Sequence, residues 1–188
     1  MDTEQRLGER DIISLQTPIT EDIAMSLQAG DRVLLSGYVY TARDAAHHNM
    51  FKNWESGGQF PIPLENETIY YVGPTPSFGE HIIGSAGPTT ALRMDKYTPL
   101  LYHMGLRATI GKGDRSEIVR KAIIDTKSVY FAALGGTGAL LSRHISSVEV
   151  IAYPELGTEA IHRLQFTQFP VIVIYDCHGN DYYRYVQK

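Results

Sequence analysis

Three short segments of the sequence combine cationic or hydroxyl side chains with a glycine or the end of a predicted strand. They are Thr41-Ala42-Arg43-Asp44, Gly87-Pro88-Thr89-Thr90-Ala91-Leu92-Arg93 and Gly111-Lys112-Gly113-Asp114-Arg115. Each segment precedes a predicted helix, so these side chains are expected to converge on one crevice at the edge of a sheet. Arg43, Arg93 and Lys112 would together suit a ligand with two negative charges.

Ordinary surface contacts account for the same three cations. In that interpretation Arg43 pairs with the adjacent Asp44, Arg93 pairs with Asp95, and Lys112 is solvated. The residues by themselves leave both interpretations open.

A glycine-rich segment, Gly135-Gly136-Thr137-Gly138, follows a predicted strand and opens a predicted helix. A dinucleotide-binding fingerprint would need a further glycine where Leu141 stands, and the sequence has no Gly-Lys-Ser/Thr phosphate-binding loop. Two interpretations remain: a tight turn with close backbone packing, or an anion site at the helix N-terminus.

Histidine and cysteine give little support to a metal site within this chain. The seven histidines are scattered and form no HExxH pair, which disfavours a zinc hydrolase. Cys177, the single cysteine, lies between Asp176 and His178; it is either a thiol nucleophile or a small buried residue at the end of a strand. One cysteine cannot by itself supply a zinc or iron–sulfur site, so no metal is expected here.

Composition indicates a single soluble domain. The 188 residues carry a net charge of −4, with 43% apolar and 20% charged residues, which is ordinary globular usage. The mild acidity and the lack of a basic stripe argue against nucleic acid as a partner. Apolar runs such as Val171–Tyr175 are far shorter than a membrane span, and the N-terminus lacks a signal sequence, so a cytoplasmic protein is expected.

The expected elements alternate along most of the chain. Met1–Gln16 is predicted to be an extension outside the core, and residues 17–188 a single domain. Helices are predicted at Glu21–Gln28, Asp44–Trp54, Thr98–Met104, Ser116–Lys127 and after Gly136. Strands are predicted at Arg32–Tyr40, Thr68–Val72, Arg107–Ile110, Val129–Ala133, Val148–Ala152, around His162–Phe166 and at Val171–Tyr175. This pattern indicates an α/β domain with a mixed sheet.

Several long motifs, in a fixed order, resemble one family. They are SGYVYTARDAAH (36–47), YYVGPTP (70–76), GSAGPTTALRMDKYTP (84–99), IGKGDRS (110–116), VYFAALGG (129–136) and VIVIYDCHGND (171–181). Together they resemble the C-terminal domain, or β subunit, of class I fumarate hydratases and the related L-tartrate dehydratases. The resemblance covers nearly all of Thr17–Tyr183, and it implies a swivelling β/β/α fold with a central mixed sheet flanked by helices.

The resemblance also implies an iron–sulfur hydro-lyase. In that family a separate domain or α subunit holds a [4Fe-4S] cluster through three cysteines. With one cysteine, and with Met1 close to the first motif, this chain resembles a separate β subunit that acts only with a cluster-bearing α subunit, in an αβ or α2β2 assembly. The TARD and GKGDRS runs favour reversible hydration of fumarate to L-malate. The alternatives are the β subunit of L-tartrate dehydratase, which converts tartrate to oxaloacetate, and a non-catalytic carboxylate-binding or regulatory domain.

The resemblance further assigns roles to four residues. Arg43 of TARD, Arg93 of GPTTxxRM and Lys112 of GKG resemble the family's carboxylate-binding cations for a small dicarboxylate substrate. Thr89, the first threonine of GPTT, is similar to the family's candidate proton-transfer base. An alcohol is a poor base alone, so Thr89 would need a carboxylate of the partner subunit.

Overall fold

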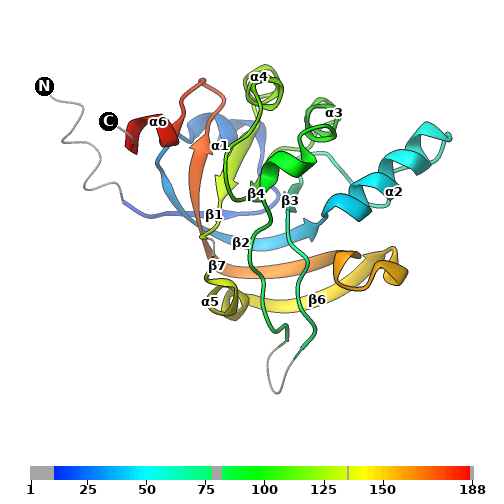
Figure 1. Ribbon diagram of the computed structural model, residues 1–188. Helices are drawn as coiled ribbons and strands as arrows, with labels where there is room; N and C mark the ends of the chain where they lie inside the picture. The colour runs from blue at the N-terminus through cyan, green and yellow to red at the C-terminus, as the bar shows by residue number, and fades with distance from the viewer. Residues whose placement is uncertain (1–10, 78–81, 135, 187–188) are drawn as a thin grey trace, which may run out of the picture.

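The computed structural model describes residues 11–77, 82–134 and 136–186, and their strands form one mixed sheet (Figure 1). The strands are β1 (Ile13–Gln16), β2 (Arg32–Thr41), β3 (Thr68–Tyr70), β4 (Ala108–Gly111), β5 (Val129–Ala132), β6 (Ile145–Ala152) and β7 (Ile161–Tyr175). Their order is β1-β2-β3-β4-β5-β7-β6, and β2 also pairs with β7. Strands β2, β3, β4, β5 and β7 therefore close into a ring.

The direction of the strands decides which loops lie together. Strands β2, β3, β4 and β5 are mutually parallel, whereas β7 runs antiparallel to both β2 and β5. The four parallel strands end at one edge of the sheet, here named the carboxyl edge. Strand β7 begins at that edge, where Arg163 pairs with Tyr40, and ends at the opposite one, where Tyr175 pairs with Tyr130.

Alternating side chains of the strands enter two separate cores. Tyr70, Val129 and Phe131 pack inside the ring, whereas Ile69 and Tyr130 pack under the helices. This division follows from the two-residue period of a strand, which sends neighbouring side chains to opposite faces. Both faces of β3, β4 and β5 are therefore buried, whereas β2 exposes Arg32 and Tyr38.

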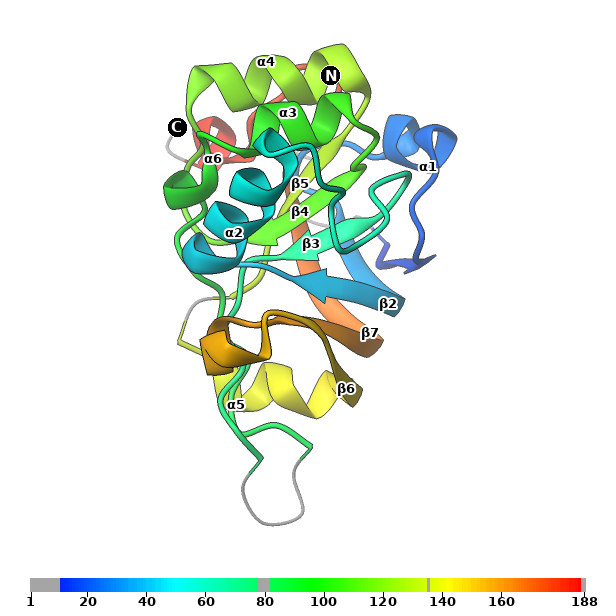
Figure 2. The same cartoon turned by 90° about the vertical axis from the view of Figure 1, so that its right-hand side faces the viewer.

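Helices pack on both cores. They are α1 (Glu21–Ser26), α2 (Asp44–Glu55), α3 (Thr98–His103), α4 (Glu117–Thr126), α5 (Gly138–Leu141) and α6 (Tyr182–Val186), with 3-10 turns η2 (Ala91–Met94), η3 (Ser142–His144) and η4 (Pro154–Glu159). Helices α2, α3 and α4 cover the outer face of the ring, whereas Ala24 of α1 and Leu141 of α5 belong to the core inside it. Figure 2 shows α2, α3 and α4 beside one another over β3, β4 and β5, with α5 on the side of β6 and β7. The longest, α2, has 12 residues, and among the described residues no helix is both long and apolar enough to cross a membrane.

The predicted fold class is confirmed, and the predicted strands and long helices agree within three residues with two exceptions. Ile13–Gln16, inside the predicted extension, forms β1, which pairs with β2, and its Ile13 and Leu15 side chains pack on the core. The two strands predicted around His162–Phe166 and at Val171–Tyr175 are one strand, β7. The strand is irregular between the two predicted parts: Gln168 has a φ of +50° and the register against β2 shifts between Leu35 and Gly37. This irregularity brings the rings of Phe166 and Phe169 to the same core, where their centroids lie 4.0 Å apart.

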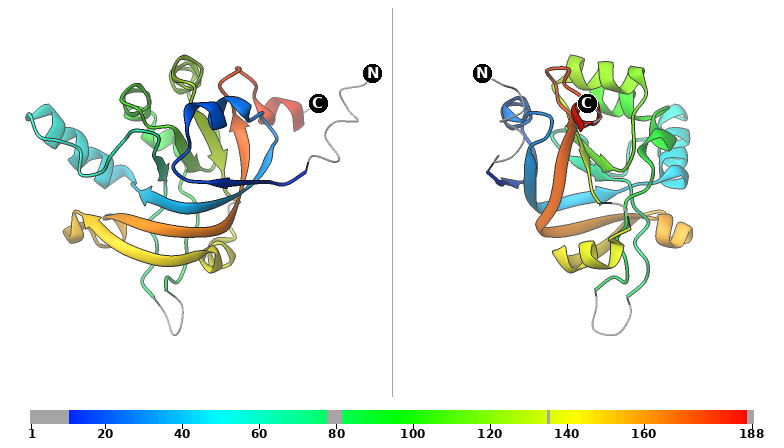
Figure 3. Two further views of the ribbon diagram at one scale, coloured as in Figure 1. Left: turned by 180° about the vertical axis from the view of Figure 1, so that it is seen from behind. Right: turned by 60° about the vertical axis from the view of Figure 1, so that its left-hand side comes forward.

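An arm, residues 72–77 and 82–88, extends from the ring beyond β3 (Figure 3). Its two segments are joined by a hydrogen bond from the Thr75 amide to the Ser85 carbonyl (3.0 Å). The Ala86 amide donates to the Gly138 carbonyl at the start of α5 (3.0 Å). A Cβ atom at Gly138 would lie 2.9 Å from the Gly87 nitrogen, so a glycine is needed at this contact. The close-packing interpretation of the glycine-rich turn holds at Gly138; Gly135 lies outside the described residues.

Gly37→Ala is expected to destabilise the fold more than Gly57→Ala. Both glycines have positive φ, +105° and +86°, so alanine is strained at either position by about 1–3 kcal/mol. Only at Gly37 would the new Cβ also meet a neighbour, Thr17 Oγ1, at 2.3 Å; nothing lies within 4 Å at Gly57. Urea unfolding of both variants measures the difference, and equal losses would contradict this packing of the Thr17 segment on β2.

Candidate functional site

Three predicted site residues lie at the carboxyl edge, and two of them follow strands. Arg43 lies two residues after β2, and Lys112 directly follows β4. Thr89 is bound between them: its amide donates to the Tyr71 carbonyl after β3 (2.7 Å), and its carbonyl accepts from the Lys112 amide (3.2 Å). The backbone of the GPTT segment thus extends the sheet between the β3 and β4 ends, which places Thr89 beside Lys112.

Arg93, the fourth predicted residue, is tied to the same edge by an ion pair. Its Nε lies 2.9 Å from Oδ1 of Asp44, the first residue of α2 and the neighbour of Arg43. The Arg93 side chain is 53% exposed. The structure thereby brings the 3-10 turn η2 next to the start of α2, and the four predicted residues onto adjoining segments.

The interpretation of these cations as ordinary surface residues predicted two ion pairs, Arg43 with Asp44 and Arg93 with Asp95, and both predictions are wrong. Arg43 pairs with Glu159 of η4 (3.2 Å), and Arg93 pairs with Asp44 instead of Asp95. Glu159 is 116 residues away from Arg43, so the local sequence gave no sign of this pair. Lys112 is exposed, as that alternative expected.

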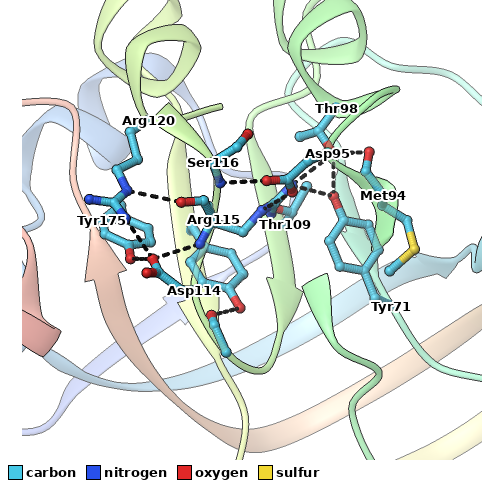
Figure 4. Close-up of polar contacts among 12 residues, drawn as sticks. Tyr71, Met94, Asp95, Thr98, Thr109, Asp114, Arg115, Ser116, Arg120 and Tyr175 are labelled. Carbon is cyan, nitrogen blue, oxygen red and sulfur yellow. Dashed lines mark hydrogen bonds and ion pairs between the residues drawn. The ribbon is translucent and has the colours of Figure 1, made fainter. Parts of the chain in front are cut away.

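A buried arginine that we did not single out from the sequence, Arg115, lies among polar side chains of neighbouring segments (Figure 4). The Arg115 side chain is fully buried, and its Nε lies 2.7 Å from Asp95 Oδ1. Its terminal nitrogens donate to the hydroxyls of Thr98 (2.8 Å), Thr109 (3.1 Å) and Tyr71 (3.3 Å). Burial alone would lower the pKa of Arg115, but the neighbouring tyrosines and Asp95 raise it above its ordinary value, so the guanidinium stays charged.

This network joins the segments that carry Lys112 and Arg93. Arg115 belongs to the loop after β4, and Asp95 directly follows η2. Asp95 Oδ2 also accepts from the Ser116 amide at 2.5 Å, so one carboxylate binds both the side chain and the backbone of the GKGDRS segment. The GKGDRS motif drew attention to this segment of the sequence. The neighbouring residues in the sequence do not reveal that Arg115 is buried and Lys112 is exposed.

Asp114 fixes the other side of the same loop. Its Oδ1 accepts from the Arg115 amide (2.7 Å), from Arg120 Nη2 (2.8 Å) and from the Tyr175 hydroxyl. Partial burial would raise the pKa of Asp114, but the bonds from Tyr175 and the Arg115 amide, with the charge of Arg120, lower it below its ordinary value. The loop that presents the exposed Lys112 is therefore held on both sides.

His47 supports the start of α2 from within the core. It is completely buried, stacked on Tyr97 (ring centroids 5.4 Å apart), and its Nδ1 lies 2.9 Å from the Arg43 carbonyl, which also accepts from the His47 amide. Burial lowers the pKa of His47 to about 4, an effect that the nearby Arg115 reinforces. A neutral imidazole that donates from Nδ1 therefore holds the Arg43 peptide.

Cys177 lies away from this site and does not fit a cluster ligand. It follows β7, so it lies at the edge opposite the carboxyl ends of the parallel strands. The thiol is buried against the Ala24 carbonyl (4.0 Å) and His178 (3.8 Å), and burial raises its pKa, which disfavours a thiolate nucleophile. Within 11–77, 82–134 and 136–186, no group of three or more His, Cys, Asp or Glu residues is placed to hold a metal ion.

Comparison with known proteins identifies the family. The sequence profile described as "Fumarase C-terminus" matches residues 1–186. The chain belongs to the fumarase C-terminal family. It is 35% identical over 183 residues to "Fumarate hydratase class I, anaerobic" of Escherichia coli (95% of this chain, 33% of that protein). It is 38% identical over 156 residues to "Fumarate hydratase 2" of Leishmania major (82% and 28%).

The family includes proteins of different lengths. The chain spans about a third of the length of the fumarate hydratases that it matches. By contrast, it covers 90% of a protein named "Putative L(+)-tartrate dehydratase subunit beta" from Methanocaldococcus jannaschii, with 35% identity over 176 residues and 90% of this chain matched. The matched sequence is thus a unit that forms about a third of the longer relatives and most of a shorter one.

Arg115→Met is expected to lower the free energy of unfolding by about 3–5 kcal/mol, because it leaves the Asp95 carboxylate buried without its cation. Arg115→Met/Asp95→Asn removes that charge and should recover part of the loss. Lys121→Met is the matched control, since it breaks an exposed pair with Asp125 and should change stability by less than about 1 kcal/mol. Urea unfolding is the measurement; an Arg115→Met variant as stable as the Lys121→Met variant would contradict the buried network.

The stability of the protein is expected to fall below pH 6.5 through His47. The folded pKa of about 4 lies below the ordinary value of 6.5, so the unfolded chain binds the proton first. The His47 contribution is complete above pH 6.5 and is lost as the pH falls towards 4, by about 2 kcal/mol at pH 5. Urea unfolding of the wild type and His47→Gln at pH 7.5 and 5 isolates this contribution, and equal pH dependence of the two would contradict a neutral buried imidazole.

Proposed function

We propose that this chain forms the dicarboxylate-binding part of a hydro-lyase active site, and that the complete enzyme reversibly hydrates fumarate to L-malate. The observation that carries the proposal is the placement of Arg43, Arg93, Lys112 and Thr89 on adjoining segments at one edge of the ring. A dicarboxylate with two negative ends suits several cations around one hydroxyl. The fumarate hydratases among the relatives support the reaction type.

Each residue has a role that its environment supports. Arg93 is half exposed and bound to Asp44 through Nε, so its terminal nitrogens are available to a carboxylate. Lys112 supplies an exposed point charge on a loop that is fixed on both sides. Glu159 contacts the terminal nitrogen Nη2 of Arg43. In the proposal the second carboxylate of the substrate displaces Glu159 and binds Arg43 in its place.

Thr89 is the proposed proton-transfer residue. Its backbone is held by Tyr71 on one side and by Lys112 on the other. A positioned hydroxyl beside cations can pass a proton to a stronger base, here a carboxylate of the partner subunit. Dehydration of malate breaks the C3–H and C2–OH bonds, forms the double bond of fumarate and releases water; hydration is the reverse. In the proposal Thr89 passes the C3 proton to or from the partner's carboxylate, and the cations hold the two carboxylates of the substrate.

The [4Fe-4S] cluster of the proposed enzyme belongs to an α subunit, since the described residues of this chain do not fit a cluster site. The chain and that subunit would form an αβ or α2β2 assembly with the carboxyl edge at their junction. One observation also favours L-tartrate dehydration: the chain covers 90% of the relative named as a tartrate dehydratase β subunit. Tartrate would use the same carboxylate-binding cations.

Co-expression with a chain that carries the cluster cysteines, followed by anaerobic assay, tests the proposal. The complex is expected to interconvert fumarate and L-malate, and the isolated chain to be inactive. Turnover of tartrate alone would establish the second candidate. A complex that binds dicarboxylates without turning any of them over would establish a non-catalytic domain.

Thr89→Val in the complex is expected to lower kcat by about 10²–10⁴ with a much smaller change in KM, because valine keeps the shape and removes the hydroxyl. The neighbouring Thr90→Val is the matched control and should retain wild-type kcat. Steady-state kinetics and exchange of the malate C3 proton with solvent are the measurements. Wild-type exchange by Thr89→Val would make Thr89 a packing residue.

A further inference from the structure

We infer that Asp44 is a positioning residue that orients Arg93 towards the substrate; this inference rests on the proposed function. Arginine has three donor nitrogens, and a carboxylate bound at Nε leaves Nη1 and Nη2 as a planar fork. Asp44 Oδ1 lies 2.9 Å from Arg93 Nε. Asp44 therefore holds the guanidinium through Nε, and a substrate carboxylate that binds end-on uses only Nη1 and Nη2.

The Asp44 carboxylate stands on a rigid support. Asp44 is the first residue of α2, and an acidic side chain in the first turn of a helix is favourable. The carbonyl of the preceding residue, Arg43, accepts hydrogen bonds from the amide and from Nδ1 of the buried His47, each at 2.9 Å. The turn that carries the carboxylate is thus fixed from the core side, and Arg93 is oriented relative to the frame of the protein.

The second oxygen of Asp44 makes no hydrogen bond to the amides of the helix end. Oδ2 is buried and has no hydrogen-bond donor among the described residues. An unsatisfied buried acceptor opposes folding, so the Asp44 carboxylate is not placed here by hydrogen bonds to its own helix. The hydrogen-bonding partner that the structure gives to this side chain is Arg93.

The contrast with Arg43 supports this distinction. Glu159 binds Arg43 through Nη2 at 3.2 Å, an atom that a substrate carboxylate would also use. Asp44 binds Arg93 through Nε and leaves both terminal nitrogens free of that carboxylate. Of the two guanidiniums, Arg93 is therefore the one already arranged for a carboxylate.

Whether Asp44→Ala weakens or strengthens dicarboxylate binding distinguishes a positioning role from a purely electrostatic effect of the charge. A negative charge beside the site repels a dianion, so electrostatics alone predicts that Asp44→Ala strengthens dicarboxylate binding. Positioning predicts the opposite, because Arg93 loses its orientation and its fork must be ordered at the moment of binding. Asp44→Asn keeps an acceptor for Nε–H without the charge and should behave like the wild type.

The test measures the Kd of succinate, an unreactive dicarboxylate, for the assembled complex, together with kcat and KM for the reactive substrate. Asp44→Ala is expected to weaken succinate binding about tenfold or more and to raise KM more than it lowers kcat, with Asp44→Asn within about threefold of wild type. In an Arg93→Ala background, Asp44→Ala should have no further effect. Asp125→Ala, which removes the carboxylate of an exposed ion pair with Lys121, is the matched control and should change nothing.

The outcomes separate the two proposals. If wild-type complex binds succinate but Asp44→Ala binds it equally or more tightly, or if its effect adds to that of Arg93→Ala, the positioning role is overturned and the proposed function stands. If wild-type complex neither binds succinate nor turns over a dicarboxylate, the proposed function fails, and the positioning role fails with it. Slow solvent exchange of the Arg93 Nε–H in wild type, lost in Asp44→Ala, would support the geometry independently of activity.

Discussion

The ion pair between Arg115 and Asp95 is the interaction on which the arrangement of the candidate site depends. A charged guanidinium without solvent contact is costly unless partners surround it, and here a carboxylate, three hydroxyls and the faces of Tyr71 and Tyr130 do so. Because Arg115 lies in the loop after β4 and Asp95 at the end of η2, the same contacts that satisfy the charge fix these two segments to each other. The exposed cations Lys112 and Arg93 belong to these two segments, so the buried pair of Arg115 and Asp95 fixes their positions relative to each other.

The closed ring supplies the second constraint. Four parallel strands end at one edge, so the residues that follow them become neighbours whatever their distance in the sequence. The antiparallel β7 closes the ring and carries its own C-terminal segment, with Cys177, to the opposite edge. The topology thus separates the candidate binding residues from the one thiol, and a rigid frame presents long, exposed cationic side chains where a ligand can reach them.

The sequence predicted the parts of the molecule that depend on local pattern. Strands and helices follow from their periodicity, and the positions of Arg43 and Lys112 at one edge follow from their places after strands that prove to be parallel. Thr89 reaches the same edge through backbone hydrogen bonds to Tyr71 and Lys112, which the sequence did not predict. Features that depend on distant residues were not predictable in this way. The pairing of Arg43 with Glu159, the burial of Arg115, the joining of Ile13–Gln16 to β2 and the continuity of β7 through the Phe166–Phe169 stack all require the assembled fold.

A dicarboxylate that binds at the carboxyl edge of the ring must protect that edge from solvent. Hydrogen–deuterium exchange of the assembled complex, with and without succinate, measures this protection. Slower exchange is expected only in residues 41–47, 87–94 and 110–116, the three segments that carry the candidate residues. Protection confined instead to residues 176–186, beside the hollow lined by Arg120, Asp181 and Arg184, would place the ligand at the other end of the molecule and rule out binding at the carboxyl edge.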